Sequence, residues 1–220
     1  MGVAANHVFK SFGTPATRVL TDINLKIEDG EFVALTGRSG SGKSTLLYLL
    51  SSLDNPSQGQ VIIGGQDVTK MTSEELHNFR NQKMGFVFQF HYLIAELTTI
   101  ENVLMPAMKF EQAEKFRGRA EFLLEQCGLK EKLGRHPRQL SGGEQQRVAI
   151  VRSLIMSPKY LFADEPTGSL DTLNGDLVMK MIRDANRENR TTVVLVTHDS
   201  DFAEQADRQI KLVDGAIVID

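Results

Sequence analysis

Hydrophobic residues form short apolar runs near both ends of the chain and a helical pattern in its middle. Near the start, Ile23, Leu25 and Ile27 alternate with polar residues, which predicts a strand with one buried face. A turn signal at Asp29-Gly30 follows, and residues 31–37 form an apolar run typical of a buried strand. We expect further strands at residues 59–65, 84–89, 159–165 and 191–199, and a final pair of short strands around Asp214-Gly215.

The polar–apolar pattern also predicts helices between these strands. We expect them over residues 43–53, 72–82, 98 to about 129, 141–157 and 172 to about 189. The second begins at Thr72 or Ser73, with acidic residues in its first turn, and the fourth has Ser141 in the N-cap position. Pro106 and Gly118 are expected to interrupt the third helix.

The order of these elements indicates the fold class. Strands alternate with helices at both ends of the chain, and the middle is mostly helical. This order is typical of an α/β core that carries a helical insertion. We therefore expect a single domain over residues 1–220, with a helical subdomain inserted at about residues 90–157.

Composition and charge narrow the functional classes. The 220 residues are 41% hydrophobic and 24% charged, which is ordinary for a globular domain, and the net charge of −3 offers no basic face for nucleic acid. The single cysteine, Cys127, has no partner for an internal disulfide, and we expect a small residue on a helix rather than a reactive thiol. Without a secretory signal pattern or an apolar run of about 18 residues, we expect a cytoplasmic protein.

A phosphate-binding loop is the clearest chemical signal. Residues 37–44, GRSGSGKS, match the pattern G-x-x-x-x-G-K-[ST] and lie between an apolar strand and an apolar helix. The glycines let backbone N–H groups turn towards phosphate oxygens. Lys43 supplies a positive charge for the β- and γ-phosphates, and Ser44 offers a hydroxyl to Mg²⁺.

Polar residues at the ends of three other predicted strands extend this site. Asp164 suits a Mg²⁺ shell, and Glu165 can polarise the water that attacks the γ-phosphate. His198 and Gln89 also follow apolar strands, where His198 can contact the γ-phosphate and Gln89 can hold Mg²⁺ or water. The alternative is that the acids cap the next loop and that His198 is structural; the phosphate-binding loop favours the functional interpretation.

A second helix start raises a different possibility. Ser141, Gly142 and Gly143 precede a long helix, and a helix N-terminus presents free N–H groups to an anion. If the helical insertion holds this element away from its own phosphate loop, it can serve only the nucleotide of a second copy. Two chains would then enclose two ATP molecules in a symmetric dimer that opens after hydrolysis.

These motifs, in this order, resemble those of the ATP-binding-cassette (ABC) ATPases over nearly the whole chain. GRSGSGKS resembles Walker A, Gln89 the Q-loop, LSGGE at 140–144 the signature, YLFADE at 160–165 Walker B, residues 169–171 the D-loop, and His198 the switch histidine. The resemblance implies a P-loop core with a mostly parallel sheet, an antiparallel β subdomain and a helical subdomain. It also implies ATP and Mg²⁺ as cofactors and ATP hydrolysis coupled to transport as the activity.

The resemblance assigns site residues position by position. Catalytic roles fall to Glu165, His198 and Gln89, and metal binding falls to Ser44, Gln89 and Asp164. The implied ATP-binding residues are Phe12, Gly37, Arg38, Ser39, Gly40, Ser41, Gly42, Lys43, Ser44, Thr45, Ser141, Gly142, Gly143, Glu144 and Asp171. Phe12 stands where the family usually has an adenine-stacking Tyr, and a core phenylalanine is the alternative. Asp171 would act across the dimer, cap the helix that begins at Thr172, or do both.

Within the family, residues 88–110 and ADEPTGSLD at 163–171 resemble the group that contains the lipoprotein-release ATPase LolD, MacB-type and HrtA-type efflux ATPases and FtsE. This implies a homodimer at the cytoplasmic face of the cell membrane, with a separate permease resembling MacB, LolC, LolE, FtsX or HrtB; a heterodimer with another cassette is the alternative. Haem, peptide or drug export stays open, as does an FtsE-like switch that transports nothing; action on DNA or ribosomes is a distant third. Residues Phe90, Tyr92, Leu93, Ile94 and Leu97 either receive a helix of the permease or fill the helical core, and Met105 and Met108 are expected in that core.

Overall fold

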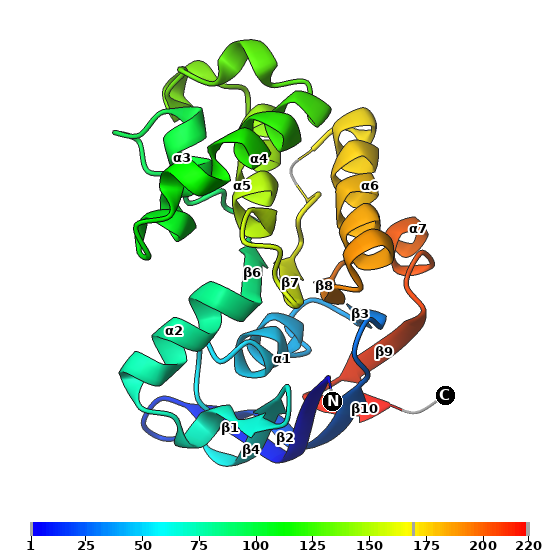
Figure 1. The fold of residues 1–220 in the computed structure, drawn as a ribbon. Coiled ribbons are helices and arrows are strands. Elements are labelled where there is room, and N and C mark those ends of the chain that lie inside the picture. The colour runs from blue at the N-terminus through cyan, green and yellow to red at the C-terminus, as the bar shows by residue number, and fades with distance from the viewer. Residues whose placement is uncertain (1, 169, 219–220) are drawn as a thin grey trace.

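A computed structural model describes residues 2–168 and 170–218 as two β-sheets and a group of helices (Figure 1). The smaller sheet is antiparallel, with strand order β2-β1-β4-β5. Its strands are β1 (Val3–Phe12), β2 (Thr17–Ile27), β4 (Gln58–Ile63) and β5 (Gln66–Asp67). The predicted alternation in β2 is confirmed, because Ile23, Leu25 and Ile27 are buried.

The larger sheet has the order β10-β9-β3-β8-β7-β6. Its strands run parallel except for β10, which pairs antiparallel with β9. Its strands are β3 (Phe32–Thr36), β6 (Met84–Val87), β7 (Tyr160–Asp164), β8 (Thr192–Val196), β9 (Arg208–Val213) and β10 (Ala216–Val218). The predicted strands of this sheet are therefore confirmed in the described part of the chain. Because β3, β6, β7 and β8 run parallel, their carboxyl ends share one edge of the sheet.

The helices lie around this sheet and above it (Figure 1). They are α1 (Lys43–Leu50), α2 (Ser73–Lys83), α3 (Thr99–Met108), α4 (Ala113–Gln126), α5 (Gly142–Leu154), α6 (Thr172–Asn189) and α7 (Ser200–Ala203), with 3₁₀ turns at Val68–Lys70, Lys130–Lys132 and Pro137–Gln139. Thr72 and Ser141 begin α2 and α5 with capping boxes, as predicted, and Thr98 caps α3 in the same way. Among the described residues, no helix has the length and apolar character needed to span a bilayer.

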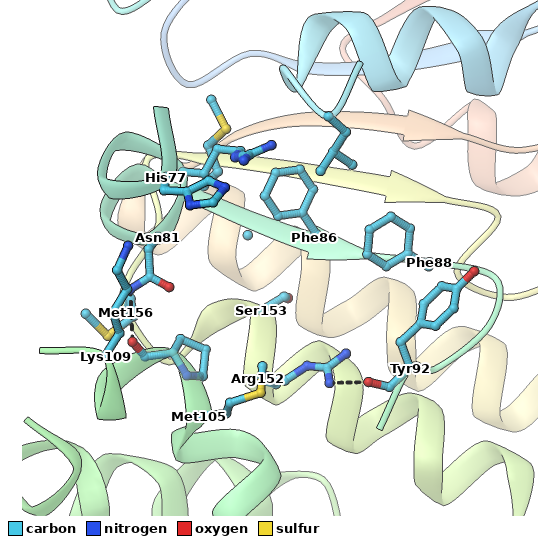
Figure 2. Close-up of a pocket in the computed structure, with 15 residues that line it drawn as sticks. His77, Asn81, Phe86, Phe88, Tyr92, Met105, Lys109, Arg152, Ser153 and Met156 are labelled. Carbon is cyan, nitrogen blue, oxygen red and sulfur yellow. Dashed lines mark hydrogen bonds between the residues drawn. The ribbon is translucent and has the colours of Figure 1, made fainter. Parts of the chain in front are cut away.

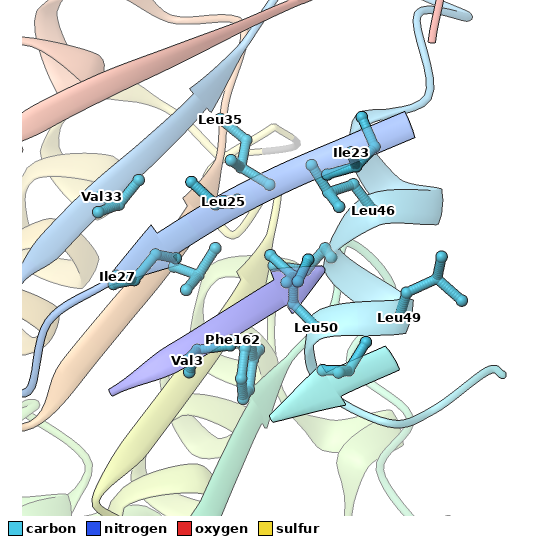
Figure 3. Close-up of a cluster of buried hydrophobic side chains, with 14 of the residues drawn as sticks. Val3, Ile23, Leu25, Ile27, Val33, Leu35, Leu46, Leu49, Leu50 and Phe162 are labelled. Atoms are coloured by element: carbon cyan, nitrogen blue, oxygen red, sulfur yellow. The ribbon is translucent and has the colours of Figure 1, made fainter. Parts of the chain in front are cut away.

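Three clusters of buried side chains hold these layers together. The largest lies between the two sheets around α1, where Leu46, Leu49 and Leu50 meet Val3 of β1 and Phe162 of β7 (Figure 3). A second cluster packs α6 against the other face of the parallel sheet. The third joins α3, α4 and α5 and contains Cys127, which is buried but lies at the C-terminal cap of α4 and not within the helix as predicted.

The structure differs from the predicted elements in several places. The long helix breaks at residues 109–112, whereas Pro106 lies inside α3 and α4 continues through Gly118. Gly118 is exposed, and a glycine there costs only about 1 kcal/mol relative to alanine, which the packing of α4 exceeds. Strand β1 was not predicted, because register shifts and a left-handed His7 interrupt its alternating pattern.

Candidate active site

Loops at the carboxyl edge of the parallel sheet enclose a cavity of about 580 Å³. Strand β3 leads into the phosphate loop, β7 ends at Asp164 and β8 is followed by His198. The described residues that line the cavity are Val19, Gly37, Ser39, Gly40, Gly42, Lys43, Ser44, Thr45, Glu165 and His198. Residues predicted from three separate sequence motifs therefore meet in one space.

The backbone of the phosphate loop requires glycine. Gly37 has a φ of 138°, and a Cβ there would lie 2.3 Å from the carbonyl oxygen of Leu212. Gly42, the residue before α1, has a φ of 100°, and a Cβ would lie 2.8 Å from Leu20. Both positions therefore exclude other side chains, and glycine lets the backbone of the loop approach an anion closely.

Lys43 begins α1 and is buried, with 7% of its surface exposed. Its Nζ donates hydrogen bonds to the carbonyl oxygens of Gly37 and Arg38, at 2.9 and 3.0 Å. The loop thus folds around the ammonium group, which lines the cavity. A buried cation at the start of a helix creates a strongly positive site that suits a phosphate group.

Asp164 lies at the end of β7 and is only 7% exposed. Ser44 Oγ donates to its Oδ1, and the Tyr48 hydroxyl donates to its Oδ2, each at 2.9 Å. Ser44 and Tyr48 are one turn apart on α1, so both reach the same carboxylate. Burial, and then the charge of Asp164 and its hydrogen bond, raise the pKa of Tyr48 to about 12.

Glu165 follows directly and has a left-handed backbone, with a φ of 46°. Its N–H donates to the carbonyl of Val196 at 2.9 Å, and its carboxylate Oε2 lies 3.3 Å from Nδ1 of His198. The loops after β7 and β8 therefore hold these two side chains together at the cavity. A carboxylate and an imidazole in contact at the mouth of a phosphate site are suited to orienting a water molecule.

The donor set at Asp164 fits Mg²⁺ better than a transition metal. The described residues contain no group of three or more His, Cys, Asp or Glu side chains that could hold an ion by themselves. The chain offers one hydroxyl, from Ser44, and one carboxylate, from Asp164. Mg²⁺ is commonly held by one or two carboxylates together with substrate phosphates and water.

Several predicted site residues lie outside this cavity. Among its described lining residues, none comes from the signature segment, the D-loop or the Q-loop, and Phe12 is also absent. Ser141 and Glu144 are occupied with each other in the capping box of α5, where the Ser141 N–H donates to the Glu144 carboxylate at 2.8 Å. In the described structure, the start of α5 therefore lies outside the cavity formed by the phosphate loop of the same chain.

The remaining predictions have mixed outcomes. Phe12 is 46% exposed and lies under Lys10 Nζ, 4.7 Å from the ring centroid, so it is not a core phenylalanine. Asp171 caps α6 by accepting the N–H of Asn174 at 2.9 Å, which confirms that alternative. Ser169 of the D-loop lies outside the described residues. Gln89 is exposed, two residues after β6.

A second cavity, of about 460 Å³, opens beside the Q-loop between β6, α2, α3 and α5 (Figure 2). Phe86, Phe88 and Tyr92 line it, and Phe90 and Ile94 nearby are exposed by 68% and 39%. Leu93 packs on the helical core, and Leu97 is partly buried. The post-Q-loop residues are thus a mixture of exposed groove residues and core contacts.

The prediction that Met105 and Met108 belong to the core is wrong. Met105 lines the second cavity and Met108 is 40% exposed. The buried face of α3 is formed by Ile100, Val103, Leu104 and Ala107. On a helix with this buried face, Met105 lies on the opposite side, and Met108 lies at the flank in the last turn.

Two residues of these sites were not predicted from the sequence. Tyr48 was read only as part of an apolar helix, although its spacing of four from Ser44 places the two on one face. Arg152 of α5 donates to the carbonyls of Tyr92 and His91 at 2.7 and 2.8 Å, and Figure 2 shows the first of these bonds. Burial lowers the pKa of Arg152. Nothing in the sequence pairs this arginine with a loop 60 residues away.

Comparisons with known proteins place this geometry in a family. The family model described as "ABC transporter" matches residues 20–168. The lipoprotein-releasing system ATP-binding protein LolD of Leptospira interrogans is 52% identical, over 99% of this chain and 91% of the relative. LolD of Aquifex aeolicus is 50% identical, over 91% and 89%. The macrolide export ATP-binding/permease protein MacB of Chlorobaculum tepidum is 46% identical, over 94% of this chain and 32% of the relative.

A solved structure shows the same architecture. The ATP-binding cassette MJ0796, described as a dimer in a post-hydrolysis state bound to ADP and Pi, matches with a TM-score of 0.91 and 39% sequence identity. The match covers 99% of this chain and 97% of that chain. The predicted fold class, a P-loop core with an antiparallel β subdomain and a helical subdomain, is confirmed.

Proposed function

Because the chain belongs to the ABC transporter family and is an ATP-hydrolysing subunit of its LolD and MacB type, we propose that it drives lipoprotein release through a separate membrane protein. The observation that carries the proposal is the 52% identity to a LolD protein over 99% of this chain. The proposal that the cargo is a lipoprotein rests on the names of such relatives.

Within the cavity, the residues divide the work of phosphoryl transfer. Lys43 and the N–H groups of the phosphate loop hold the β- and γ-phosphates of ATP. Ser44 and Asp164 hold Mg²⁺, which supplies positive charge to the phosphate oxygens when it is bound. Glu165 accepts a proton from the attacking water, and His198, 3.3 Å away, holds that carboxylate and faces the γ-phosphate.

We place the second half of each ATP site on another copy of the chain. Ser141, Gly142, Gly143 and Glu144 begin α5 outside the cavity, and Ser141 is exposed. In a two-fold dimer, this helix start would face the γ-phosphate held by the partner's phosphate loop, and Asp171 would lie at the same interface. ATP thereby joins the two copies, and hydrolysis removes the group that both contact. The dimeric form of the similar MJ0796 cassette supports this arrangement.

The membrane partner docks, in this proposal, at the groove beside the Q-loop. The groove combines the exposed ring of Tyr92 with a hollow between α2 and α3 (Figure 2). The exposed ring of Phe90 lies beside it, with its centroid 6.3 Å from that of Tyr92. An amphipathic helix can place its apolar face in such a hollow. The subunit would then lie at the inner face of the cell membrane, as a peripheral partner of a LolC-, LolE- or MacB-like permease, with Gln89 between groove and nucleotide.

A pull-down from native membranes tests this function. The Glu165→Gln variant, loaded with ATP, should recover a membrane protein with few spans and a large external domain, identified by mass spectrometry. Lys43→Ala, which cannot hold ATP, is the matched control and should recover less of it. Recovery of ribosomes or DNA-bound proteins without a membrane partner would overturn the transport proposal while leaving the ATPase chemistry intact.

The reconstituted complex distinguishes cargo. ATPase activity that rises with an added lipoprotein, and release of that lipoprotein from the vesicle, would support lipoprotein release. Stimulation by haem, a peptide or a drug in place of lipoprotein would reassign the cargo. An FtsE-like switch would instead activate an extracytoplasmic enzyme while transporting none of these compounds.

A further inference from the structure

We infer that Tyr48 is a positioning residue for the magnesium site: its hydroxyl fixes the Asp164 carboxylate in the orientation that binds the metal. The inference rests on the proposed function, because it takes Asp164 as a Mg²⁺ ligand. It adds a residue that lies outside the phosphate-loop pattern of residues 37–44. Tyr48 does not touch the nucleotide cavity in the described structure.

The contacts of Asp164 carry the argument. Its two oxygens are separately held, Oδ1 by Ser44 and Oδ2 by Tyr48, each at 2.9 Å. The carboxylate is only 7% exposed, so water offers little replacement for a lost donor. Two donors on opposite oxygens fix the plane of a carboxylate, whereas one donor lets it rotate.

The two donors have different roles once the metal binds. Ser44 is itself a proposed ligand of Mg²⁺, so its oxygen is recruited when the ion binds. Tyr48 contacts the oxygen of Asp164 that faces away from Ser44, and it can keep its bond in both states. Hydrogen bonds of this kind orient metal ligands, and their loss commonly costs about 10- to 100-fold in metal affinity or activity.

The fold places Tyr48 where this role is possible. It lies one turn after Ser44 on α1, and its ring packs partly buried against the cluster between the two sheets. A phenylalanine would keep that packing and remove only the hydroxyl. Tyr48→Phe therefore separates the hydrogen bond from the structural contribution of the ring.

The test measures metal binding directly. In a Glu165→Gln background, which prevents turnover, Mn²⁺ is titrated into protein with ATP and the bound ion is followed by electron paramagnetic resonance. We expect Tyr48→Phe to raise the dissociation constant for Mn²⁺ about tenfold. Its affinity for ATP in the presence of EDTA, and its melting temperature without nucleotide, should stay close to those of the parent. An unchanged Mn²⁺ affinity would overturn the inference.

Two further variants separate the possible failures. Tyr160→Phe removes a tyrosine hydroxyl 3.4 Å from Asp29 at the opposite end of β7, and it should leave Mn²⁺ binding unchanged. Equal weakening in Tyr160→Phe would mean a general loss of stability and would count against Tyr48. Asp164→Asn should abolish the binding of Mn²⁺ at this site. If Asp164→Asn binds Mn²⁺ normally, the proposed metal site itself is wrong. If Asp164→Asn loses Mn²⁺ binding but Tyr48→Phe binds Mn²⁺ normally, the metal site stands and the proposed role of Tyr48 is wrong.

Discussion

At the scale of single residues, Glu165 combines an unusual backbone with a defined partner. A left-handed φ of 46° at a residue other than glycine costs of order 1 kcal/mol, and the N–H bond to Val196 helps to hold it. The resulting position brings its carboxylate to His198 beside the phosphate loop. Strain that points a carboxylate into a phosphate site is consistent with a role in hydrolysis.

Glu165→Gln should lower the rate of ATP hydrolysis about 100- to 1,000-fold, because the amide keeps the shape of the side chain but accepts no proton. ATP binding should persist, and the variant should accumulate as an ATP-bound dimer. Phosphate release and size-exclusion chromatography with ATP measure the two effects. Glu188→Gln, at an exposed position on α6, is the matched control. Hydrolysis at the normal rate in Glu165→Gln would remove it as the base.

The reactivity of Cys127 should depend on pH in a direction that its burial sets. Burial raises the pKa of its thiol from 9.0 to about 11, so the reactive thiolate is scarcer in the folded protein at every pH below that value. At pH 8 the folded protein should react with a thiol reagent about 100-fold more slowly than the urea-unfolded chain, on the pKa difference alone. The absorbance of the group that the thiol reagent releases measures both reaction rates. Equal rates would contradict the buried position.

The sequence predicted the site residues that belong to a fixed local pattern. The phosphate loop requires glycine and lysine at set spacings, and strand-end acids follow a readable apolar run, so Lys43, Ser44 and Asp164 could be identified. Tyr48 and Arg152 could not, because their partners are separated from them by 116 and 60 residues. Which distant atoms a polar side chain will reach depends on packing that no local pattern encodes.

At the scale of elements, the same limit appears in different form. Thr72, Thr98 and Ser141 begin their helices with side-chain caps, a local signal that the sequence carries. Strand β1 was missed because its register shifts against both neighbours, and the face of α3 that carries Met105 depends on how the helix packs. Helix starts are local events, whereas strand register and helix orientation are set by neighbouring elements.

Helix α5 joins two regions with separate proposed roles. Ser141 lies at its start, and Arg152 near its end holds the backbone of His91 and Tyr92 beside the groove. The guanidinium fork makes two bonds to consecutive carbonyls, which fixes the loop relative to the helix. A partner that presses on this loop therefore acts on the helix that carries the signature residues.

Arg152→Lys should lower recovery of the membrane partner about tenfold. A lysine keeps the charge but cannot donate to both carbonyls as the guanidinium fork does. A hydrogen bond from a charged group contributes roughly 1.5–3 kcal/mol, so the loss of one such bond accounts for an effect of this size. The pull-down with ATP measures the recovery. Arg187→Lys, exposed on α6, is the matched control and should recover the partner at the parental level. Parental recovery by Arg152→Lys would show that the fork does not shape the docking groove.

At the scale of the whole molecule, we propose that each chain carries two incomplete halves of a nucleotide site. The phosphate loop, Asp164 and Glu165 gather at the sheet edge, and Ser141 begins α5 away from their cavity. In this proposal a single chain contacts ATP on one side only. A dimer related by two-fold symmetry would complete both sites at once, since each copy gives the other what it lacks.

This arrangement predicts that two inactive variants restore each other. Ser141→Arg should bind ATP as a monomer but not hydrolyse it, because the bulky cation blocks the partner's nucleotide; Lys43→Ala should lose ATP binding. In a mixed dimer, the intact phosphate loop of the Ser141→Arg chain meets the intact Ser141 of the Lys43→Ala chain. An equal mixture should regain about a quarter of the parental ATPase rate, since half of the dimers are mixed and each has one complete site of two. Phosphate release from the mixture and from each variant alone measures this. Hydrolysis by Ser141→Arg alone, or a mixture as inactive as its components, would contradict a site shared between two copies.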